Sequence, residues 1–338
     1  MSHSPARPPS RRDFLNHALV GAVALSPALL AAHQLAASPL AHPREKPDQQ
    51  TRTETAPVDA DSAGWIDAHV HVWTPDIKQY PLSPEFDVSH MQPPSFTDAE
   101  LMSHCRPVGV KRIVLIQMNF YQYDHSYMLH VMRQHPGVFS AVGLVDHRSP
   151  HLAARIDELA SSGIRGFRLH SMSDAEQWVD HPGMAQLWRQ SAERGLAVCP
   201  LINPTDIPYI DSLCDKFPDT TVVVDHFARI GVSGSIEQAR LDELCGLARF
   251  PNVHVKTSAF YALGKKRAPH TDLIPMLRRV LDSFGPERLM WGSDCPYQVQ
   301  APHSYADSLA VLTEHMDFLS SSDRQWLLRG TAEKVFFA

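Results

Sequence analysis

Residues 65–73 have the sequence Trp65-Ile66-Asp67-Ala68-His69-Val70-His71-Val72-Trp73. Polar and apolar residues alternate along this stretch, which is typical of a β-strand, because successive side chains of a strand point to opposite faces. The alternation predicts that Asp67, His69 and His71 share one face of the strand. The opposite face is predicted to pack against the elements that cover the sheet; its residues are Ile66, Ala68, Val70 and Val72. Side chains on one face of a strand lie roughly 6.5–7 Å apart, so two imidazoles here can reach one metal ion or one substrate.

The composition is that of an ordinary globular protein. The chain has 338 residues, 43% of them hydrophobic, and a formal net charge of −6. No block of Lys and Arg occurs in its body, which argues against nucleic acid or an acidic membrane surface as the main partner. The five cysteines form no CxxC pair, so we expect buried thiols rather than a disulfide framework.

The first 64 residues are predicted to be an export signal followed by a linker. Ser10-Arg11-Arg12-Asp13-Phe14-Leu15 precedes an apolar run over 18–32, which predicts a twin-arginine export signal over 1–37 and a periplasmic or extracytoplasmic destination through the twin-arginine export machinery. The run contains Gly21 and Pro27 and is too short for a membrane span, so no stable membrane insertion of the mature protein is expected. Residues 38–64 are rich in Pro, Ser, Thr and charge and predict a disordered linker.

Residues 65–338 alternate apolar runs with segments of helical spacing. After the first strand, strands are predicted at 112–118, 139–145, 164–170, 196–202, 221–227, 253–258 and 288–294, and helices at 152–161, 184–194, 207–217, 238–250 and 273–284. Further helices are expected from Ser304 and Asp323, and Thr97 with Glu100 forms a capping box that opens another helix. Eight such units predict an α/β protein with a single (β/α)8 TIM barrel. An open doubly wound sheet is less favoured, because no Gly-rich phosphate turn follows an early strand.

Polar residues stand at the ends of four predicted strands. His69 and His71 end the first strand, and Arg168 and His170 share a face at the end of the fourth; the sixth and eighth strands end in His226 and Asp294. The catalytic residues of such barrels lie at the C-terminal ends of the strands, so these side chains are predicted to form one site.

Two chemistries are open to this set of residues. His69, His71 and Asp294 could hold one divalent metal ion, with zinc as the best match to these ligands. Alternatively, Asp294 could activate water without a metal, while the imidazoles and Arg168 stabilise the oxyanion. Both routes lead to hydrolysis at a carbonyl carbon.

Several other residues could bind the substrate. Arg168 and Lys256 could meet a carboxylate or a hydroxylated group, and His170 shares a face with Arg168. Five aromatic residues on loops that follow strands could form the floor or wall of a pocket for a sugar-like ligand; they are Trp73, Tyr121, Tyr123, Tyr261 and Tyr297.

Five motifs resemble those of the amidohydrolase superfamily, and within it the amidohydrolase-2 group of sugar-lactonase and pyrone-dicarboxylate-lactonase-like proteins. They are residues 66–71, 224–226, 255–258, 288–296 and 329–332. The resemblance implies that His69 and His71 are metal or substrate ligands, that His226 is a histidine of the site, and that Asp294 is the catalytic aspartate. Other branches of the superfamily place a further metal ligand at the ends of strands four and five; the predicted fifth strand offers no histidine, and His170 at the end of the fourth could substitute. The resemblance also leaves metal dependence open, because the lactonase branch includes members that need no metal.

The resemblance leaves three readings of function. The first is a hydrolase that opens a lactone, or a related cyclic ester, of a small polar or carboxylated molecule. The second is a metal-dependent decarboxylase, which a histidine ligand beyond the His69–His71 pair would favour. The third is a barrel that binds a ligand without turnover, although the complete set of His69, His71, His226 and Asp294 argues against it.

Overall fold

The structure of the protein is a computed structural model that describes residues 64–338, and the predicted export signal and almost all of the predicted linker lie outside these residues. Eight parallel strands form one sheet in chain order and curl into a nearly closed barrel, which confirms the predicted TIM barrel. The strands are β1 (Trp65–Val70), β2 (Val110–Ile116), β3 (Phe139–Gly143), β4 (Ile164–His170), β5 (Ala197–Leu201), β6 (Thr221–Val224), β7 (Val253–Ser258) and β8 (Leu289–Gly292).

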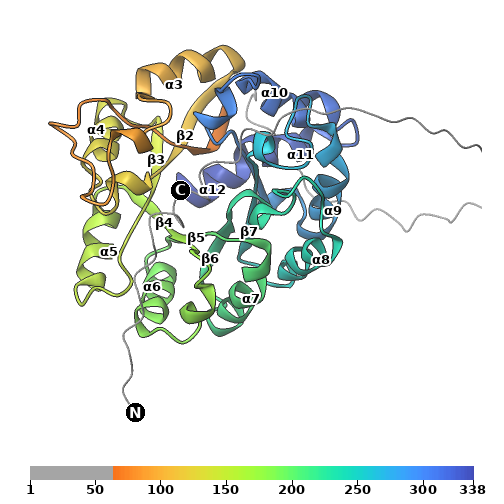
Figure 1. Ribbon diagram of the computed structural model, residues 1–338. Helices are drawn as coiled ribbons and strands as arrows, with labels where there is room; N and C mark the ends of the chain where they lie inside the picture. Colours follow the sequence, from red (N-terminus) through yellow and green to blue (C-terminus); the bar gives the residue numbers. More distant parts are fainter. Residues whose placement is uncertain (1–63) are drawn as a thin grey trace, which may run out of the picture. The chain divides into compact units, whose positions relative to one another are not determined.

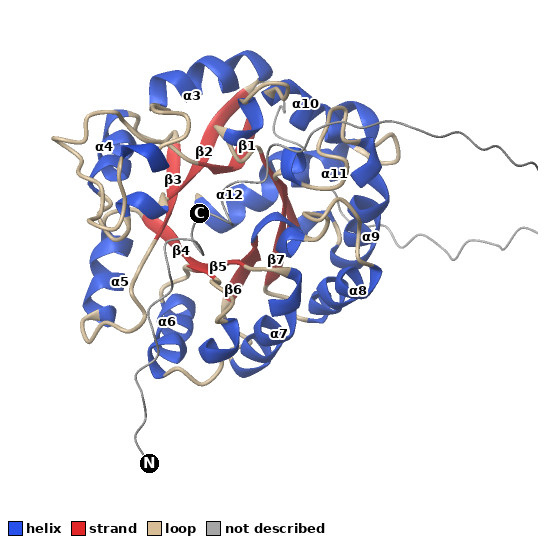
Figure 2. Cartoon of the chain, viewed as in Figure 1, coloured by secondary structure: helices blue, strands red, loops and turns tan. Residues whose placement is uncertain are grey.

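Helices surround the strands, as Figures 1 and 2 show. Their bounds are α3 (Asp98–Cys105), α4 (Ser126–Gln134), α5 (Leu152–Ser161), α6 (Pro182–Glu193), α7 (Ile207–Lys216), α8 (Gln238–Gly246), α9 (Ile274–Phe284), α10 (Tyr305–Ala310), α11 (Ser321–Gln325) and α12 (Thr331–Phe336). The predicted capping box is present, because Thr97 and Glu100 each bond the other's backbone N–H at the start of α3. No helix in the described part of the chain is long and apolar enough to cross a membrane.

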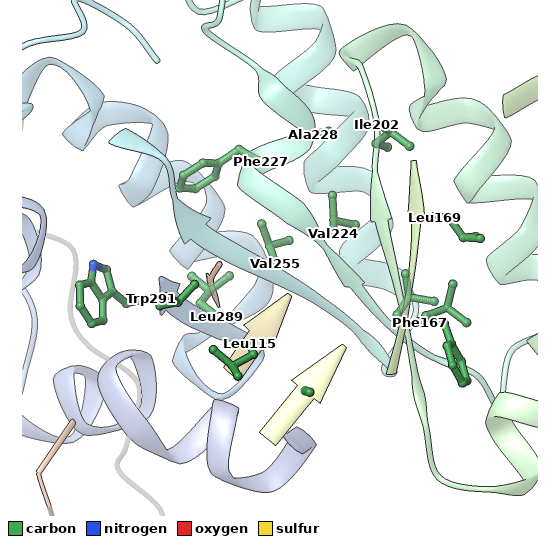
Figure 3. Packing of buried hydrophobic residues seen from close by; sticks show 14 of the residues in the cluster. Leu115, Phe167, Leu169, Ile202, Val224, Phe227, Ala228, Val255, Leu289 and Trp291 are labelled. Carbon is green, nitrogen blue, oxygen red and sulfur yellow. The ribbon is translucent and has the colours of Figure 1, made fainter. Parts of the chain in front are cut away.

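Two hydrophobic clusters stabilise the barrel. The larger one lies between the strands and the surrounding helices and includes Val224, Val255 and Leu289 from three neighbouring strands (Figure 3). The smaller one fills the barrel interior, because it joins strands from all round the ring to α12; its members are Ile66, Ala68, Val114, Ile116, Val142, Ala197, Cys199, Val223, Met290, Ala332 and Phe336. Burying each large apolar side chain contributes about 1.5–3 kcal/mol, so these clusters are the main source of stability.

The last helix closes the end of the barrel opposite the predicted site. Ser140, near the start of β3, donates a hydrogen bond of 2.6 Å to the carbonyl of Phe336 in α12. In Figure 1, α12 appears inside the ring of strands. Side chains of α12 thus fill this end of the barrel interior, and the predicted site lies at the opposite end, where the strands end.

Six predicted strands were too long at their C-terminal ends, and two of these end at left-handed turns. The sixth ends at Val224 rather than Phe227, because residues 226–229 have φ between 52° and 60°. The eighth ends at Gly292 rather than Asp294, and Asp294 has φ 64°. A left-handed backbone cannot continue a strand, and in non-glycine residues it is uncommon and concentrated at functional sites.

The unfolding free energy is expected to decrease as the pH falls from about 6.5 towards 4. Burial lowers the pKa of both His125 and His254 to about 4, whereas these histidines titrate near 6.5 in an unfolded chain. In that interval the unfolded state binds more protons, so each histidine removes up to about 3 kcal/mol of stability. Urea unfolding of wild type and His254→Gln at several pH values measures this, and an equal pH slope in the variant would contradict it.

Candidate active site

A bulge in β1 determines where the two histidines point. From Asp67 to Val70, β1 advances three residues while β2 advances only two, from Ile113 to Leu115. One extra residue in a strand reverses the alternation of the side chains beyond it. His69 therefore points into the barrel like Ile66 and Ala68 before it, and Val70 packs outward.

The prediction that Asp67 shares a face with His69 and His71 is therefore wrong. Asp67 points outward, where its carboxylate accepts a hydrogen bond from Tyr305 of α10. The same bulge makes the prediction for the apolar face wrong in part, because Ile66 and Ala68 line the interior, whereas Val70 and Val72 contact the outer cluster. The alternation of polar and apolar residues in the sequence predicts a regular strand, and it does not reveal where one extra residue is inserted relative to the neighbouring strand.

Asp294 lies at the centre of the site, between three imidazoles. Its Oδ1 is 3.2 Å from Nε2 of His71 and 3.6 Å from Nε2 of His69, and its Oδ2 is 3.9 Å from Nε2 of His226. The Oδ2 atom also accepts a hydrogen bond of 2.8 Å from Tyr261. Burial alone would raise the pKa of Asp294, but His226, His71 and His69 outweigh it and lower the pKa below its usual range, so Asp294 is ionised at neutral pH.

Gly292 makes room for His69 against β8. A Cβ atom at position 292 would lie 2.7 Å from Cβ of His69 and 3.1 Å from its backbone nitrogen. No side chain except that of glycine fits there without a backbone shift.

Gly292→Ala is expected to reduce the unfolding free energy by about 1–3 kcal/mol, as overpacking of a core typically does, and to displace His69. Urea unfolding measures the change. Gly246→Ala is the matched control, because a Cβ at position 246 meets nothing within 4 Å. Equal stability of the two variants would refute the close packing of His69 against β8.

His226 leaves β6 in the left-handed turn, and Ser258 fixes its ring. Nδ1 of His226 is 2.8 Å from Oγ of Ser258 at the end of β7, which turns Nε2 towards Asp294. Burial lowers the pKa of His226 to about 4 despite the nearby carboxylates of Asp294 and Asp225. His226 is thus a neutral imidazole at neutral pH.

A buried cluster of charges lies beneath these side chains. Asp225 faces Nζ of Lys256 at 3.0 Å and Nη2 of Arg168 at 3.2 Å, and all three side chains are at most 5% exposed. Burial alone would raise the pKa of Asp225, but Lys256, His69 and Arg168 hold it well below its usual range. Two cations are thus held inside the barrel by one carboxylate.

The cluster also surrounds the ring of His69. Nη2 of Arg168 is 2.9 Å from Nε2 of His69, and Nδ1 lies 3.2 Å from Nζ of Lys256 and 3.4 Å from Oδ1 of Asp225. Burial and Lys256 lower the pKa of His69 well below its usual value, so the ring is neutral. Arg168 and Lys256, which were predicted to bind substrate, both contact Asp225 and His69.

The other two predicted substrate-binding residues lie at the rim. Tyr297 has its ring 6.0 Å from that of His71, beside the site. His170 contacts Asn119 at 3.1 Å and Arg229 at 3.4 Å.

The close contacts that three residues make in this region were not predicted. Asp225 could have been found from its place beside His226 in the motif over 224–226, but it was treated only as part of the family pattern. Arg229 follows three residues after His226, and no local pattern marks it. Tyr261 was noted only as one of several loop aromatics, because the left-handed turns that bring it to Asp294 leave no trace in the apolar periodicity.

The residues fit a divalent cation in type and spacing. His69, His226 and Asp294 each offer a ligand atom within 4.8 Å of the others. In addition, Nδ1 of His71 donates to the carbonyl of Ile116 at 2.9 Å, which points Nε2 towards Oδ1 of Asp294, 3.2 Å away. In the described part of the chain, the cluster of potential ligands includes His226 but neither His71 nor His170.

A barrel with buried imidazoles and ionised carboxylates at the C-terminal ends of its strands defines the class of TIM-barrel enzymes. The family model described as Amidohydrolase matches residues 66–338, and the chain therefore belongs to the amidohydrolase family.

The similar proteins include two lactone-cleaving enzymes by name. The chain is 31% identical over 277 residues to L-fucono-1,5-lactonase of Burkholderia ambifaria, which covers 79% of this chain and 93% of that protein. It is 25% identical over 261 residues to 2-pyrone-4,6-dicarboxylate hydrolase of Comamonas testosteroni, with 74% and 82% covered. A crystal structure of an amidohydrolase from Burkholderia multivorans with bound zinc has the same fold, with a TM-score of 0.69 and 24% identity over 81% of this chain and 99% of that one.

Proposed function

We propose that the protein hydrolyses a lactone, or a related cyclic ester, of a small polar or carboxylated molecule. The observation that carries this proposal is the position of Asp294, an ionised carboxylate held between the imidazoles of His69, His71 and His226. The names of the relatives support the same reaction class.

In the proposed reaction, Asp294 takes a proton from a water molecule as the water oxygen attacks the lactone carbonyl carbon. Arg168, together with a neighbouring imidazole, stabilises the negative charge that develops on the carbonyl oxygen. The ring C–O bond then breaks, and the departing alkoxide takes the proton back from Asp294 to give a hydroxy acid. Tyr261 holds the carboxylate in place through its hydrogen bond to Oδ2.

The low pKa of Asp294 makes it a weak base, so the water needs further activation. A divalent cation bound by His69, His226 and Asp294, for which zinc is the best match, would lower the pKa of its water and polarise the carbonyl. Arg168 opposes such a cation, because its guanidinium occupies Nε2 of His69 and would have to move. If the enzyme works without a metal, Arg168 can keep its contact with Nε2 of His69.

The residues at the rim favour an anionic substrate. Arg229 bonds the amide oxygen of Asn203 at 3.1 Å, and no carboxylate of the described residues lies within ion-pair distance of it. Burial and the nearby Arg168 lower the pKa of Arg229, although Asp294 and Asp225 act against this, and among the described residues its guanidinium has no close carboxylate as a counter-ion. A carboxylate on the substrate would supply one.

One experiment tests the reaction class, the substrate class and the metal. Purified protein is assayed by elemental analysis and, before and after chelation, with carboxylated lactones, neutral sugar lactones and aromatic carboxylic acids. We expect hydrolysis of lactones, with the carboxylated ones preferred. Release of carbon dioxide from aromatic acids without lactone hydrolysis would refute the proposal.

A decarboxylase is the second candidate, and His226 is the observation that favours it. This histidine lies beyond the His69–His71 pair and joins His69 and Asp294 in the ligand cluster. A decarboxylase of this kind would lose all activity on chelation, whereas a lactonase that relies on Asp294 and Arg168 would retain it.

We also propose that residues 1–37 direct the protein through the twin-arginine machinery to the periplasm or another extracytoplasmic location. The support is the Arg11-Arg12 pair followed by the apolar run over 18–32. A fusion of residues 1–37 to a reporter that folds before export is expected to appear outside the cytoplasm. Replacement of both arginines by lysine is expected to keep it inside, and export of that variant would refute the assignment.

A further inference from the structure

The barrel closes between β8 and β1, at the place where the histidine pair and Asp294 stand. In the described sheet these two strands are not paired as a ladder; only an isolated bridge joins Val70 and Cys295. Two backbone hydrogen bonds cross this junction between β8 and β1, each 2.8 Å long. The N–H of Asp294 donates to the carbonyl of His69, and the N–H of His71 donates to the carbonyl of Cys295. The geometry of the site therefore depends on a short, irregular junction.

One side chain bonds both sides of this junction. Asp67 is fully buried, and its Oδ1 accepts a hydrogen bond of 3.0 Å from the backbone N–H of His69 and one of 2.9 Å from that of Ser293. His69 is a residue of the proposed site, and Ser293 directly precedes Asp294. The other oxygen, Oδ2, accepts from Tyr305.

The backbone explains why these donors depend on a side chain. The bulge in β1 disturbs the ladder at His69, and β8 ends at Gly292, just before Ser293. A bulged residue is left out of the regular ladder pairing. A buried N–H without a partner is costly, and here the carboxylate of Asp67 takes the place of the missing ladder acceptors.

We propose that Asp67 is a positioning residue for the hydrolysis: its Oδ1 atom ties His69 to the Ser293–Asp294 turn and so sets the distance between the imidazoles and the base. The inference rests on the proposed function for its catalytic consequence, but the geometry it assigns is independent of substrate. Oδ2 and Tyr305 play a different part, because they anchor the carboxylate to α10 without contacting the site.

Asp67→Ala and Asp67→Asn separate this role from general stability. Loss of the tie is expected to lower kcat about 10- to 100-fold with little change in KM, since small displacements of catalytic groups cost this much. Asp67→Asn retains an acceptor oxygen for both N–H groups, and its amide can donate to Tyr305, so kcat is expected to stay within about threefold of wild type.

Tyr305→Phe is the matched control. It removes the anchor on Oδ2 but leaves Oδ1 in place, so it is expected to lower the melting temperature while leaving kcat unchanged. A folded Asp67→Ala with wild-type kcat would overturn the proposal. Should Asp67→Ala not fold, Asp67→Asn still decides: a natively folded Asn variant with kcat reduced more than about tenfold would show that Asp67 does not act through its acceptor geometry.

A spectroscopic measurement tests the geometry without turnover. In protein labelled with ¹⁵N-histidine, the ring resonances of His69, assigned by their loss in His69→Gln, are expected to shift in Asp67→Ala and to stay in place in Asp67→Asn and Tyr305→Phe. If wild type turns over no lactone, the proposed function fails, but this result still stands. Unchanged His69 resonances in folded Asp67→Ala would overturn the inference even if lactone hydrolysis is confirmed.

Discussion

Asp294→Asn is expected to lower kcat for lactone hydrolysis by about 10²–10⁴-fold, the usual contribution of a general base. Asparagine has nearly the same shape as aspartate and can still accept the hydrogen bond from Tyr261, but its amide cannot take a proton from water. The fold should therefore remain intact while the chemical step slows. Steady-state kinetics with circular dichroism as a check on folding measures the effect.

Asp317→Asn is the matched control, because Asp317 is an exposed carboxylate in the segment between α10 and α11. It is expected to leave kcat unchanged. A natively folded Asp294→Asn with the turnover of wild type would remove Asp294 from the mechanism, and with it the proposed way of activating water.

Asp225→Ala is expected to reduce the unfolding free energy by about 3–5 kcal/mol, the usual cost of removing one partner from a buried ion pair. Asp225 is the carboxylate that faces both Lys256 and Arg168 inside the barrel. Without it, two buried cations and the ring of His69 remain close together with no opposing charge. Urea unfolding monitored by tryptophan fluorescence measures the loss.

The exposed pair of Asp242 and Arg279 provides the control for this experiment. Their charged atoms are 3.0 Å apart, as in the buried cluster, but the two side chains are 63% and 56% exposed. Asp242→Ala is expected to cost no more than about 1 kcal/mol, because water replaces the lost partner. Equal losses in Asp225→Ala and Asp242→Ala would show that the buried cluster is not held by charge.

Several elements could be predicted closely because the signals for them are local. The strand at Val253–Ser258 and the helix at Leu152–Ser161 match their predicted ranges, since each is bounded by changes in apolar period. The capping box of Thr97 and Glu100 was likewise predictable, because both partners lie within one turn.

The candidate site was predictable only as a set of residues at strand ends. The structure brings His69, His71, His226 and Asp294 together, but their roles as catalytic residues and metal ligands stay predictions. The ligand cluster differs in one member from the predicted one, because His226 lies within it and His71 beside it. Apolar periodicity shows which strand ends carry polar residues and does not show how far each side chain reaches.

The sequence by itself determined the order of strands and helices, and hence a parallel barrel with its polar residues at one end, because hydrophobic period and strand-end position are properties of short segments. Only the tertiary structure decided the face on which Asp67 and His69 stand, the left-handed turns that aim His226 and Asp294, and the assembly of Asp225, Lys256 and Arg168 around one imidazole. The physical reason is that the bulge and the turns are stabilised by contacts such as that of Asp67 with Ser293, 226 positions away. No pattern within a single strand contains that information.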